Sequence, residues 1–392
     1  MKTGKIFIQI ASYRDNQLLS TVKDCIHKAQ FPDNLVFCIA WQHSEVDKWD
    51  NLDAYANDKR FKIIDIDYRD SEGACWARNR IQQYYDGEEY TLQLDSHHYF
   101  MTNWDTQLID MIKKLQEAGY KKPLLTAYLP SYNSEADPDE RVMVPWQMNF
   151  DKFTPEGIVL FIPAVINNYG KLDGPIRCRF YSGHFCFTLG LFCIEVQHDP
   201  ELYFHGEEIS IAARAYTWGY DLFTPHKIIA WHEYSRKNRI KHWDDNDSWA
   251  IRNEKSLAKV RSLFDLELPL ACKYGFGLHR SLAEYEKYTG ICFKNRIVDI
   301  YTLNHKEPPN SESIFSLSIR IPVLLSDYKF LAIIFEDINN NPIFRQDYTP
   351  NEIISNEIPI TFTYTIKPHK YIIWAHSNDN KWGNKIEKLI DQ

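Results

Sequence analysis

Paired cysteines, long apolar runs and an excess of positive charge are all missing from this chain of 392 residues. Its eight cysteines are scattered, without a Cys-x-x-Cys pair, so the sequence does not favour a disulfide framework. Cys38 and Cys186 lie inside apolar runs, where we expect buried thiols. We therefore predict a reducing, cytoplasmic environment.

No apolar run approaches the ~18 residues that a membrane-spanning helix requires. The first apolar run, which follows Lys5, is short and interrupted, and no cleavage site follows it. We therefore expect neither a signal peptide nor a transmembrane segment. The formal net charge of −8 gives no reason to expect nucleic acid or an anionic membrane as a partner.

Aromatic residues, in contrast, are plentiful, with 11 Trp, 24 Tyr and 22 Phe. Such a content suits either clefts that stack on sugars or aromatic-rich cores. Hydrophobic residues make up 44% and charged residues 25% of the chain, which is typical of a soluble globular protein. The length corresponds to roughly two to three domains.

The N-terminal part of the chain alternates strand-like and helix-like segments. Strands are predicted at residues 5–12, 35–41, 61–68, 90–94 and 123–130, and helices at residues 18–29, 71–80 and 104–118. This alternation predicts an α/β domain over residues 1–242, with helices that cover a parallel sheet.

The rest of the chain has a different character. Residues 243–270 are mostly charged and helical, and we treat residues 243–299 as a helical connector. Alternating runs at residues 314–321, 330–335, 358–366 and 371–375 then predict a small all-β, sandwich-like module over residues 300–392. Such a module either binds a carbohydrate or a partner, or packs against the first domain. The sequence leaves both possibilities open.

The strand at residues 90–94 runs directly into Asp95-Ser96-His97. Residues two apart on an extended segment point to the same side, so Asp95 and His97 can offer an oxygen and a nitrogen to one cation. This pair suits Mn²⁺ well and Mg²⁺ less well. The alternative is an ordinary turn that carries Asp, Ser and His without a function.

Polar residues also follow the other predicted strands. Ser12, Tyr13 and Arg14 follow the first strand, Trp41 ends the second and Asp67 lies near the end of the third. Ligands bind beyond the carboxyl ends of such strands, so we expect one binding edge there. In the alternative interpretation Asp67 caps the next helix, Tyr13 and Trp41 pack, and Arg14 pairs with a surface carboxylate.

Three further features lie beyond residue 130. Residues 131–181 lack periodicity and are predicted to form a binding loop or lid, or else a decorated surface. Glu207 and Glu208 open a predicted helix, where the helix dipole alone also favours acidic residues. His232 follows a short strand; it is the natural third ligand for a cation held by Asp95 and His97, although a lone His is often structural.

Six short motifs, taken in order, carry a resemblance to a known family. They are Ala11-Ser12-Tyr13-Arg14-Asp15, Asp95-Ser96-His97, Ser182-Gly183-His184-Phe185, Gly206-Glu207-Glu208-Ile209, Thr217-Trp218-Gly219-Tyr220-Asp221 and His232-Glu233-Tyr234. The chain resembles, over about residues 5 to 240, the cytoplasmic N-acetylglucosaminyltransferases that modify hydroxyproline on a ubiquitin-ligase adaptor, and their bacterial relatives. More distantly it resembles the polypeptide N-acetylgalactosaminyltransferases, which also use an Asp-x-His metal motif.

The resemblance implies a retaining glycosyltransferase with a GT-A type, Rossmann-like nucleotide-sugar domain. It implies Mn²⁺ or Mg²⁺ as cofactor, UDP-GlcNAc as the donor, and a hydroxyl of a protein or glycan as the acceptor. In such a reaction the acceptor attacks the face from which the leaving group departs, and a β-phosphate oxygen takes its proton. A double displacement with one Glu as nucleophile is the less favoured alternative.

The strand-end pattern and the resemblance together give the candidate site residues. The donor-binding residues are Ser12, Tyr13, Arg14, Trp41, Asp67, Arg78, Asn79, Asp95, Ser96 and His184. The metal ligands are Asp95, His97 and His232, and the catalytic residues, which face donor sugar and acceptor, are Glu207 and Glu208. Trp146 and Tyr181, in the irregular segment, are predicted to lie on the acceptor side.

Two other functions remain open from the sequence. A nucleotidyltransferase acting on sugar phosphates shares this architecture, but it normally uses several carboxylates rather than a mixed Asp/His set. A catalytically inactive carbohydrate-binding or scaffold protein is the second alternative, which the intact set of Asp95, His97, Glu207, Glu208 and His232 disfavours.

Overall fold

The computed structural model describes residues 2–49, 51–235, 239–265, 273–310, 315–323 and 328–390. The chain divides into two compact units. The first comprises Met1–Met148, Pro163–Leu263 and Leu270–Ser281, and the second comprises Asn149–Ile162, Phe264–Pro269 and Leu282–Gln392. Residues 266–270 of the predicted helical stretch and residue 314 of the first predicted β run lie outside the described residues.

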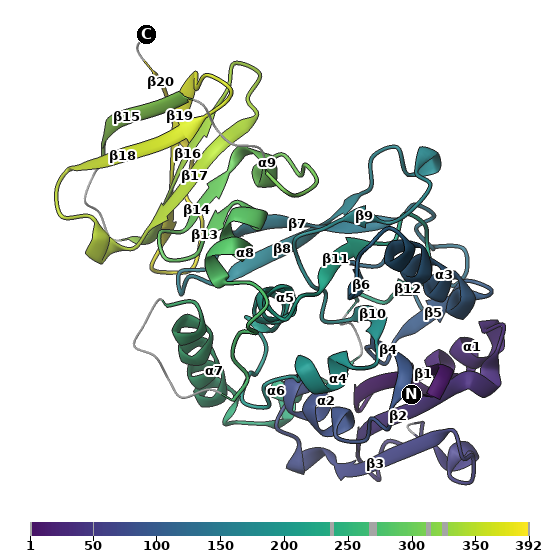
Figure 1. The fold of residues 1–392 in the computed structure, drawn as a ribbon. Helices are drawn as coiled ribbons and strands as arrows, with labels where there is room; N and C mark the ends of the chain where they lie inside the picture. The colour runs from purple at the N-terminus through teal and green to yellow at the C-terminus, as the bar shows by residue number, and fades with distance from the viewer. Residues whose placement is uncertain are drawn as a thin grey trace. The chain divides into compact units, whose positions relative to one another are not determined.

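The first unit is built on an eight-stranded sheet with the order β3-β2-β1-β4-β10-β6-β11-β9 (Figure 1). Its strands are β1 (Lys2–Tyr13), β2 (Leu35–His43), β3 (Phe61–Asp67), β4 (Glu88–Leu94), β6 (Pro123–Thr126), β9 (Ile176–Arg177), β10 (Phe185–Leu189) and β11 (Asp221–Thr224). The strands β3, β2, β1 and β4 are parallel, as predicted, but β10 runs antiparallel to β4 and β6. The predicted α/β class is therefore confirmed, with a mixed rather than a wholly parallel sheet.

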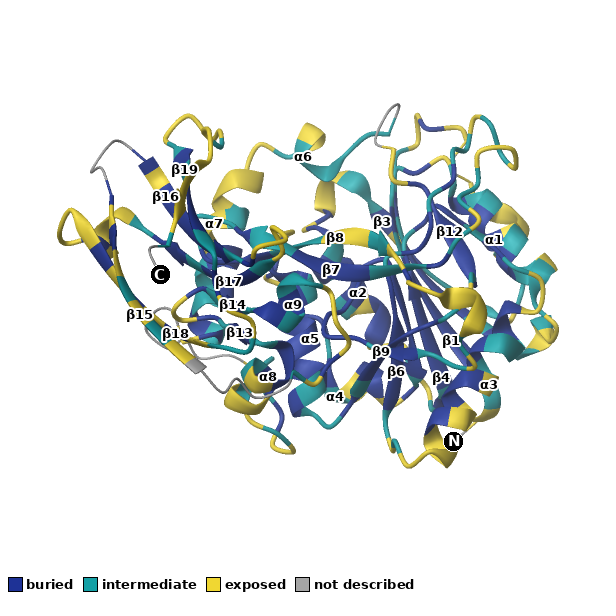
Figure 2. Cartoon of the chain, turned by 90° about the horizontal axis from the view of Figure 1, so that it is seen from above, coloured by how far each residue is buried: buried dark blue, intermediate teal, exposed yellow. Residues whose placement is uncertain are grey.

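Helices cover both faces of this sheet. They are α1 (Leu18–Lys28), α2 (Ala74–Gln82), α3 (Trp104–Glu117), α4 (Phe192–Glu195) and α5 (Glu207–Thr217), and the same unit also contains α6 (His242–Asp245) and α7 (Trp249–Leu263). Side chains of α1 and α3, such as Val22 and Trp104, share a core with Ile8 of β1. Phe7, which precedes Ile8 in β1, packs with Ala77 of α2 on the opposite face. Burial on both faces explains the near-continuous apolar runs of the strands. Figure 2 shows the buried residues of the strands in dark blue.

The carboxyl ends of the four parallel strands meet at one edge, as the sequence predicts. Ser12 pairs with Trp41, His43 with Asp67, and Ile10 with Leu94, so these strands end side by side. Asp67 lies on β3, however, which is three strands away from β4, or about 14 Å at the usual strand spacing.

Two short antiparallel strands complete the site region of the first unit. β5 (His98–Phe100) pairs with β12 (Ala230–His232), and His98 lies opposite His232 in this pairing. The ladder therefore fixes His232 beside the turn that carries His97, although 135 residues separate the two in the sequence.

The second unit contains the predicted all-β module. One sheet has the order β13-β14-β17-β16-β19-β20, and a two-stranded sheet pairs β15 with β18. The elements are α8 (Leu282–Thr289), β13 (Ile291–Cys292), β14 (Ile297–Asp299), α9 (Ile300–Leu303), β15 (Phe315–Pro322), β16 (Tyr328–Glu336), β17 (Pro342–Tyr348), β18 (Glu357–Tyr364), β19 (Lys370–Ser377) and β20 (Ile386–Leu389). Ile333 of one sheet and Ile360 of the other lie in a common core, which is the packing of a sandwich.

One prediction for residues 131–181 was wrong in part. β7 (Trp146–Phe153) and β8 (Val159–Val165) form a hairpin in what the sequence predicts to be irregular chain. Pro163 inside β8 and the exposed positions of that strand hide its period-two pattern.

Two further expectations from the sequence concern buried cysteines and membrane-spanning helices. Cys38 and Cys186 are buried free thiols, as predicted. Among the described helices none is long and apolar enough to cross a membrane.

A glycine at the end of β10 offers a test of the first unit. A Cβ at Gly190 would lie 2.0 Å from the carbonyl oxygen of Glu88, whereas a Cβ at Gly174 would meet nothing within 4 Å. We expect Gly190→Ala to lower the free energy of unfolding by about 2–4 kcal/mol, because backbone cannot yield as a flexible side chain can. Gly174→Ala should change it by less than about 1 kcal/mol. Urea unfolding that finds the two variants equally stable would contradict this packing.

Candidate active site

Asp95, His97 and His232 form a compact cluster of possible metal ligands. Asp95 directly follows β4, and His232 ends β12. One ligand atom from each residue lies within 4.8 Å of the others. Oδ2 of Asp95 is 3.7 Å from Nε2 of His97 and 3.4 Å from Nε2 of His232. The three residues predicted from the sequence are thus brought together.

The state of His232 fits a metal ligand. The ring is buried, and neither of its nitrogens has a hydrogen-bond partner in the part of the chain that the structure describes. Burial holds the pKa of His232 well below its usual range, so the imidazole is neutral and its lone pair is available. Burial opposes ionisation of Asp95, but its contacts with His232 and Arg78 hold the pKa of that carboxyl well below its usual range. A carboxylate with two imidazoles is a donor set suited to Mn²⁺.

Asp15 orients His97 from behind. Its Oδ2 is 2.7 Å from Nδ1 of His97 and accepts a hydrogen bond from the Ser96 hydroxyl at 2.7 Å. This contact leaves Nε2 of His97 to face Asp95, an arrangement common around metal-bound histidines. The sequence-based prediction missed Asp15 as a site residue. The available signal was its position in the loop after β1, beside Ser12 and Arg14.

Arg78 joins two carboxylates from different elements. From α2, its Nη2 donates to Oδ1 of Asp95 at 2.6 Å, and its Nη1 donates to Oε1 of Glu207. The Arg78 side chain is only 6% exposed, so it lies beneath these carboxylates. We predicted that it lies over the nucleotide or sugar; in the structure both terminal nitrogens are already engaged by protein.

Glu207 and Glu208 begin α5, as predicted, but they have different surroundings. Burial raises the pKa of Glu207, and the positive charge of Arg78 opposes this rise. Glu208 accepts hydrogen bonds from the Gly183 N–H at 2.9 Å and from the Tyr128 hydroxyl at 2.8 Å. Burial raises the pKa of Glu208 to about 7, so this carboxyl titrates near neutral pH.

His184 packs directly against the possible metal ligands. Its ring stacks on that of His232 with centroids 4.1 Å apart, and its Nε2 accepts a hydrogen bond from the Leu129 N–H. Burial lowers the pKa of His184 to about 3, so the ring is neutral, with its proton on Nδ1. The Tyr234 ring, which belongs to the motif His232-Glu233-Tyr234 but was given no role, meets both histidines edge to face.

A cavity of about 270 Å³ opens in front of the cluster. It is lined by Ala11, Tyr13, Asp15, Gly73, Ala74, Asp95, Ser96, His97, Tyr203, Phe204, His232, Tyr234, Arg239, Ile240, Lys241, His242 and Trp243. Tyr13, Asp95 and Ser96 are predicted donor-binding residues among them. The aromatic side chains in this lining that come from residues 203–204 and from the start of α6, Tyr203, Phe204, His242 and Trp243, were not predicted, because these short segments carry no recognisable pattern.

The loop after β1 is held by ion pairs. Arg14 makes two hydrogen bonds to Asp47, at 2.6 and 3.0 Å, and one to Asp245 at 2.9 Å. The Tyr13 hydroxyl donates to the same Asp245 carboxylate. Ser12 is fully buried. Arg14 therefore pairs with carboxylates, as in the alternative interpretation, and keeps Tyr13 at the rim of the cavity.

Several predicted residues have structural contacts of their own. Trp41 stacks on His43 with ring centroids 3.5 Å apart, and Asp67 caps the short helix after β3 and pairs with Arg69. The Asn79 amide donates to the backbone carbonyl of His198. Trp41, Asp67 and Asn79 are not among the residues that line the cavity in front of the possible metal ligands.

The two predicted acceptor residues also differ. Tyr181 is fully buried and stacks against Phe192, so the structure gives an acceptor no access to it. Trp146 is partly exposed and lies 6.1 Å from Tyr234, ring to ring.

Three comparisons relate the chain to known proteins. A family model described as Glycosyltransferase (GlcNAc) matches residues 5–59 and 50–295. The structure of GalNAc-T7 with UDP, GalNAc and Mn²⁺ is similar with a TM-score of 0.48 and 15% identity, over 72% of this chain and 50% of that chain. Staphylococcus aureus TarS 1-349 in complex with UDP-GlcNAc is similar with a TM-score of 0.38 and 13% identity, over 68% of this chain and 76% of that chain. Comparison with curated protein sequences gives no match.

The chain therefore spans about half the length of the GalNAc-T7 chain. The family model, in contrast, covers well over half of this chain and includes every candidate site residue from Ser12 to His232. The resemblance drawn from the six motifs is confirmed, and the mixed sheet with helices on both faces is the architecture expected of a GT-A domain. The chain belongs to the Glycosyltransferase (GlcNAc) family.

Proposed function

We propose that this protein is a metal-dependent, retaining glycosyltransferase that transfers GlcNAc from UDP-GlcNAc to a hydroxyl group. The observation that carries the proposal is the cluster of Asp95, His97 and His232 at the carboxyl edge of the sheet, facing a cavity. Family membership supports the sugar transfer, and the family description supports GlcNAc as the sugar.

Asp95, His97 and His232 would hold a divalent cation, Mn²⁺ or Mg²⁺, and the buried ring of His232, whose nitrogens have no hydrogen-bond partner among the described residues, fits this role. When bound, such a cation neutralises the charge that develops on the departing diphosphate. The chain's own residues orient the site around it: Asp15 fixes the ring of His97, and Arg78 fixes the carboxylate of Asp95.

Glu207 and Glu208 would position hydroxyl groups of the sugar and the acceptor rather than act as the general base. Oε1 of Glu207 accepts a hydrogen bond from Arg78, and the two oxygens of Glu208 accept hydrogen bonds from Gly183 and Tyr128. A carboxylate held on both sides is a poor nucleophile but a rigid hydrogen-bond partner. Tyr13 and the aromatic residues near His242 would contact the nucleotide in the cavity.

The donor can be tested by UDP release in the presence of Mn²⁺ from a panel of UDP-sugars. We expect UDP-GlcNAc to be turned over at least about tenfold faster than UDP-glucose, because the N-acetyl group adds contacts worth roughly 1.4 kcal/mol or more. Faster turnover of UDP-glucose would contradict the GlcNAc assignment while leaving the sugar transfer intact. No turnover of any UDP-sugar would contradict the enzyme.

The metal assignment can be tested through Asp15, which holds the ring of His97 but is not one of the three proposed metal ligands. We expect Asp15→Asn to weaken the apparent Mn²⁺ affinity roughly 10–100-fold, because the ring of His97 loses its anionic partner, with UDP release restored at high Mn²⁺. Asp95→Ala should abolish UDP release at every Mn²⁺ concentration, and the exposed Asp110→Asn should behave as the wild type. Full activity of Asp95→Ala, or of the wild type in excess chelator, would overturn the assignment.

The raised pKa of Glu208 predicts a pH-dependent stability. Below its ordinary pKa of 4.5 the carboxyl is protonated in both folded and unfolded chains, so its titration does not lower the free energy of unfolding. As the pH rises from 4.5 to about 7, the unfolded chain releases a proton that half-buried Glu208 keeps in the folded chain, so stability is lost over this range. We expect Glu208→Gln to remove about 2 kcal/mol of this loss between pH 4.5 and 8, measured by urea unfolding. Exposed Glu117→Gln is the control. If the stability of Glu208→Gln and of the wild type depends on pH in the same way, the raised pKa of Glu208 is refuted.

A further inference from the structure

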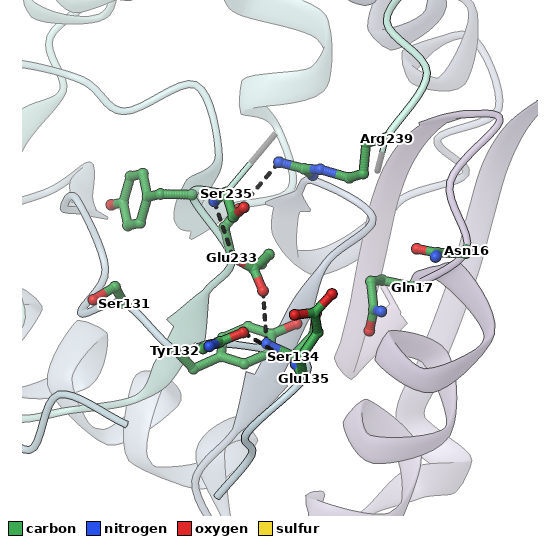
Figure 3. A pocket seen from close by; sticks show the side chains of 11 residues that line it. Asn16, Gln17, Ser131, Tyr132, Ser134, Glu135, Glu233, Ser235 and Arg239 are labelled. Carbon is green, nitrogen blue, oxygen red and sulfur yellow. Dashed lines mark hydrogen bonds between the residues drawn. The ribbon is translucent and has the colours of Figure 1, made fainter. Parts of the chain in front are cut away.

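A second cavity, of about 520 Å³, lies next to the first and shares Tyr234 and Arg239 with it. Its lining is Asn16, Gln17, Ser131, Tyr132, Asn133, Ser134, Glu135, Glu233, Tyr234, Ser235 and Arg239. Figure 3 shows Glu233 in the middle of this group, with Tyr132, Ser134 and Glu135 on one side and Gln17 on another. The volume lies in the range of small-molecule sites, which is about 300–1,000 Å³.

The wall of this cavity is attached to the backbone of two metal ligands. Ser131 forms a bridge with His232, and the Tyr132 N–H donates to the His232 carbonyl at 3.3 Å. The Glu233 N–H donates to the His97 carbonyl at 3.1 Å. A molecule bound against this wall therefore lies beside the place where the donor diphosphate would be held.

Glu233 stiffens the wall rather than offering a free carboxylate. It is buried, and its two oxygens accept hydrogen bonds from the N–H groups of Ser134 at 2.7 Å and Ser235 at 2.9 Å, which Figure 3 shows as dashed lines. The two neighbouring segments that form this wall, residues 131–135 and 233–235, are thus tied together.

One buried polar group in the lining points to a ligand. Tyr132 is only 3% exposed, and its hydroxyl has no hydrogen-bond partner among the described residues. A buried hydroxyl that stays unpaired costs about 1–3 kcal/mol, so such a group usually has a partner, either a protein group or a bound molecule such as water. The neighbouring amides and hydroxyls of Gln17, Ser131 and Ser134 add further hydrogen-bonding groups.

We propose that this cavity binds the acceptor and that the acceptor is a carbohydrate, an inference that rests on the proposed glycosyltransferase function. Amide, hydroxyl and carboxylate side chains match the dense hydroxyl groups of a sugar. Tyr234 is 37% exposed and lines both cavities, so its ring is placed to stack on a sugar where donor and acceptor meet.

A peptide acceptor fits this cavity less well. Extended peptides bind by pairing with a free strand edge or by filling apolar pockets. The backbone along this wall is already used, because Ser131 is paired with His232 and accepts from the Val142 N–H, and the Ser134 N–H is bound to Glu233.

The reaction at the junction of the cavities is a balanced transfer. A hydroxyl oxygen of the acceptor sugar forms a bond to C1 of GlcNAc as the bond from C1 to the β-phosphate oxygen breaks. The hydroxyl proton passes to the departing diphosphate, so no other reactant is consumed. Bound in the cavity, the acceptor hydroxyl would need no side-chain base from the wall.

The full-length protein can be tested with UDP-GlcNAc and Mn²⁺ by comparing a pool of di- and trisaccharides with a pool of peptides that contain Ser, Thr and hydroxyproline. We expect the saccharides, and not the peptides, to stimulate UDP release. Tyr132→Phe and Gln17→Ala should raise the saccharide KM at least about fivefold, and more than they lower acceptor-free UDP release. Stimulation by the peptides alone, or by neither pool, would overturn the proposal.

The controls separate this proposal from the function on which it rests. Tyr328→Phe removes another buried, unpartnered tyrosine hydroxyl, but in the β module, and should leave the saccharide KM unchanged. Saturation-transfer NMR with the same saccharides needs no turnover; binding that is weakened in Tyr132→Phe would support the cavity even if UDP-GlcNAc were not the donor. If Tyr132→Phe and Tyr328→Phe behave alike in both measurements, the cavity does not hold the acceptor.

Discussion

One buried guanidinium joins the parts of the site. Arg78 of α2 contacts Asp95, at the end of β4, and Glu207, at the start of α5. Removing one partner of a buried charge pair is strongly destabilising, because the remaining charges lose their compensation. Without Arg78, the carboxylates of Asp95 and Glu207 would face each other across a poorly hydrated space. The relative positions of the end of β4, the start of α5 and the possible metal ligands therefore depend on this contact.

The charges around Arg78 explain why the site suits a divalent cation. Burial keeps His184 and His232 neutral, so their rings add no positive charge beside Asp95. Arg78 compensates Glu207 as well as Asp95, and among the described residues the ring nitrogens of His232 have no hydrogen-bond partner. Such a site attracts a cation that a nucleoside diphosphate can share.

The sequence predicted the α/β class, the all-β module and the grouping of Asp95 with His97 and His232, because strand ends and ordered motifs are local signals. It could not predict partners that only the fold brings together. Arg78 was placed over the ligand because a sequence does not show which carboxylates a buried arginine meets. Tyr181 was given to the acceptor although it packs in the core, and Tyr132 was overlooked in a segment without periodicity.

The central claim is that Asp95, His97 and His232 hold the cation against the donor diphosphate. Anomalous X-ray diffraction from crystals grown with Mn²⁺ and UDP tests it most directly, since it locates manganese without reference to activity. The account predicts one strong peak that contacts an Asp95 oxygen, an imidazole nitrogen of His97 and one of His232, with the diphosphate on its open side. Manganese bound elsewhere, with these three side chains unchanged and UDP in place, would contradict it.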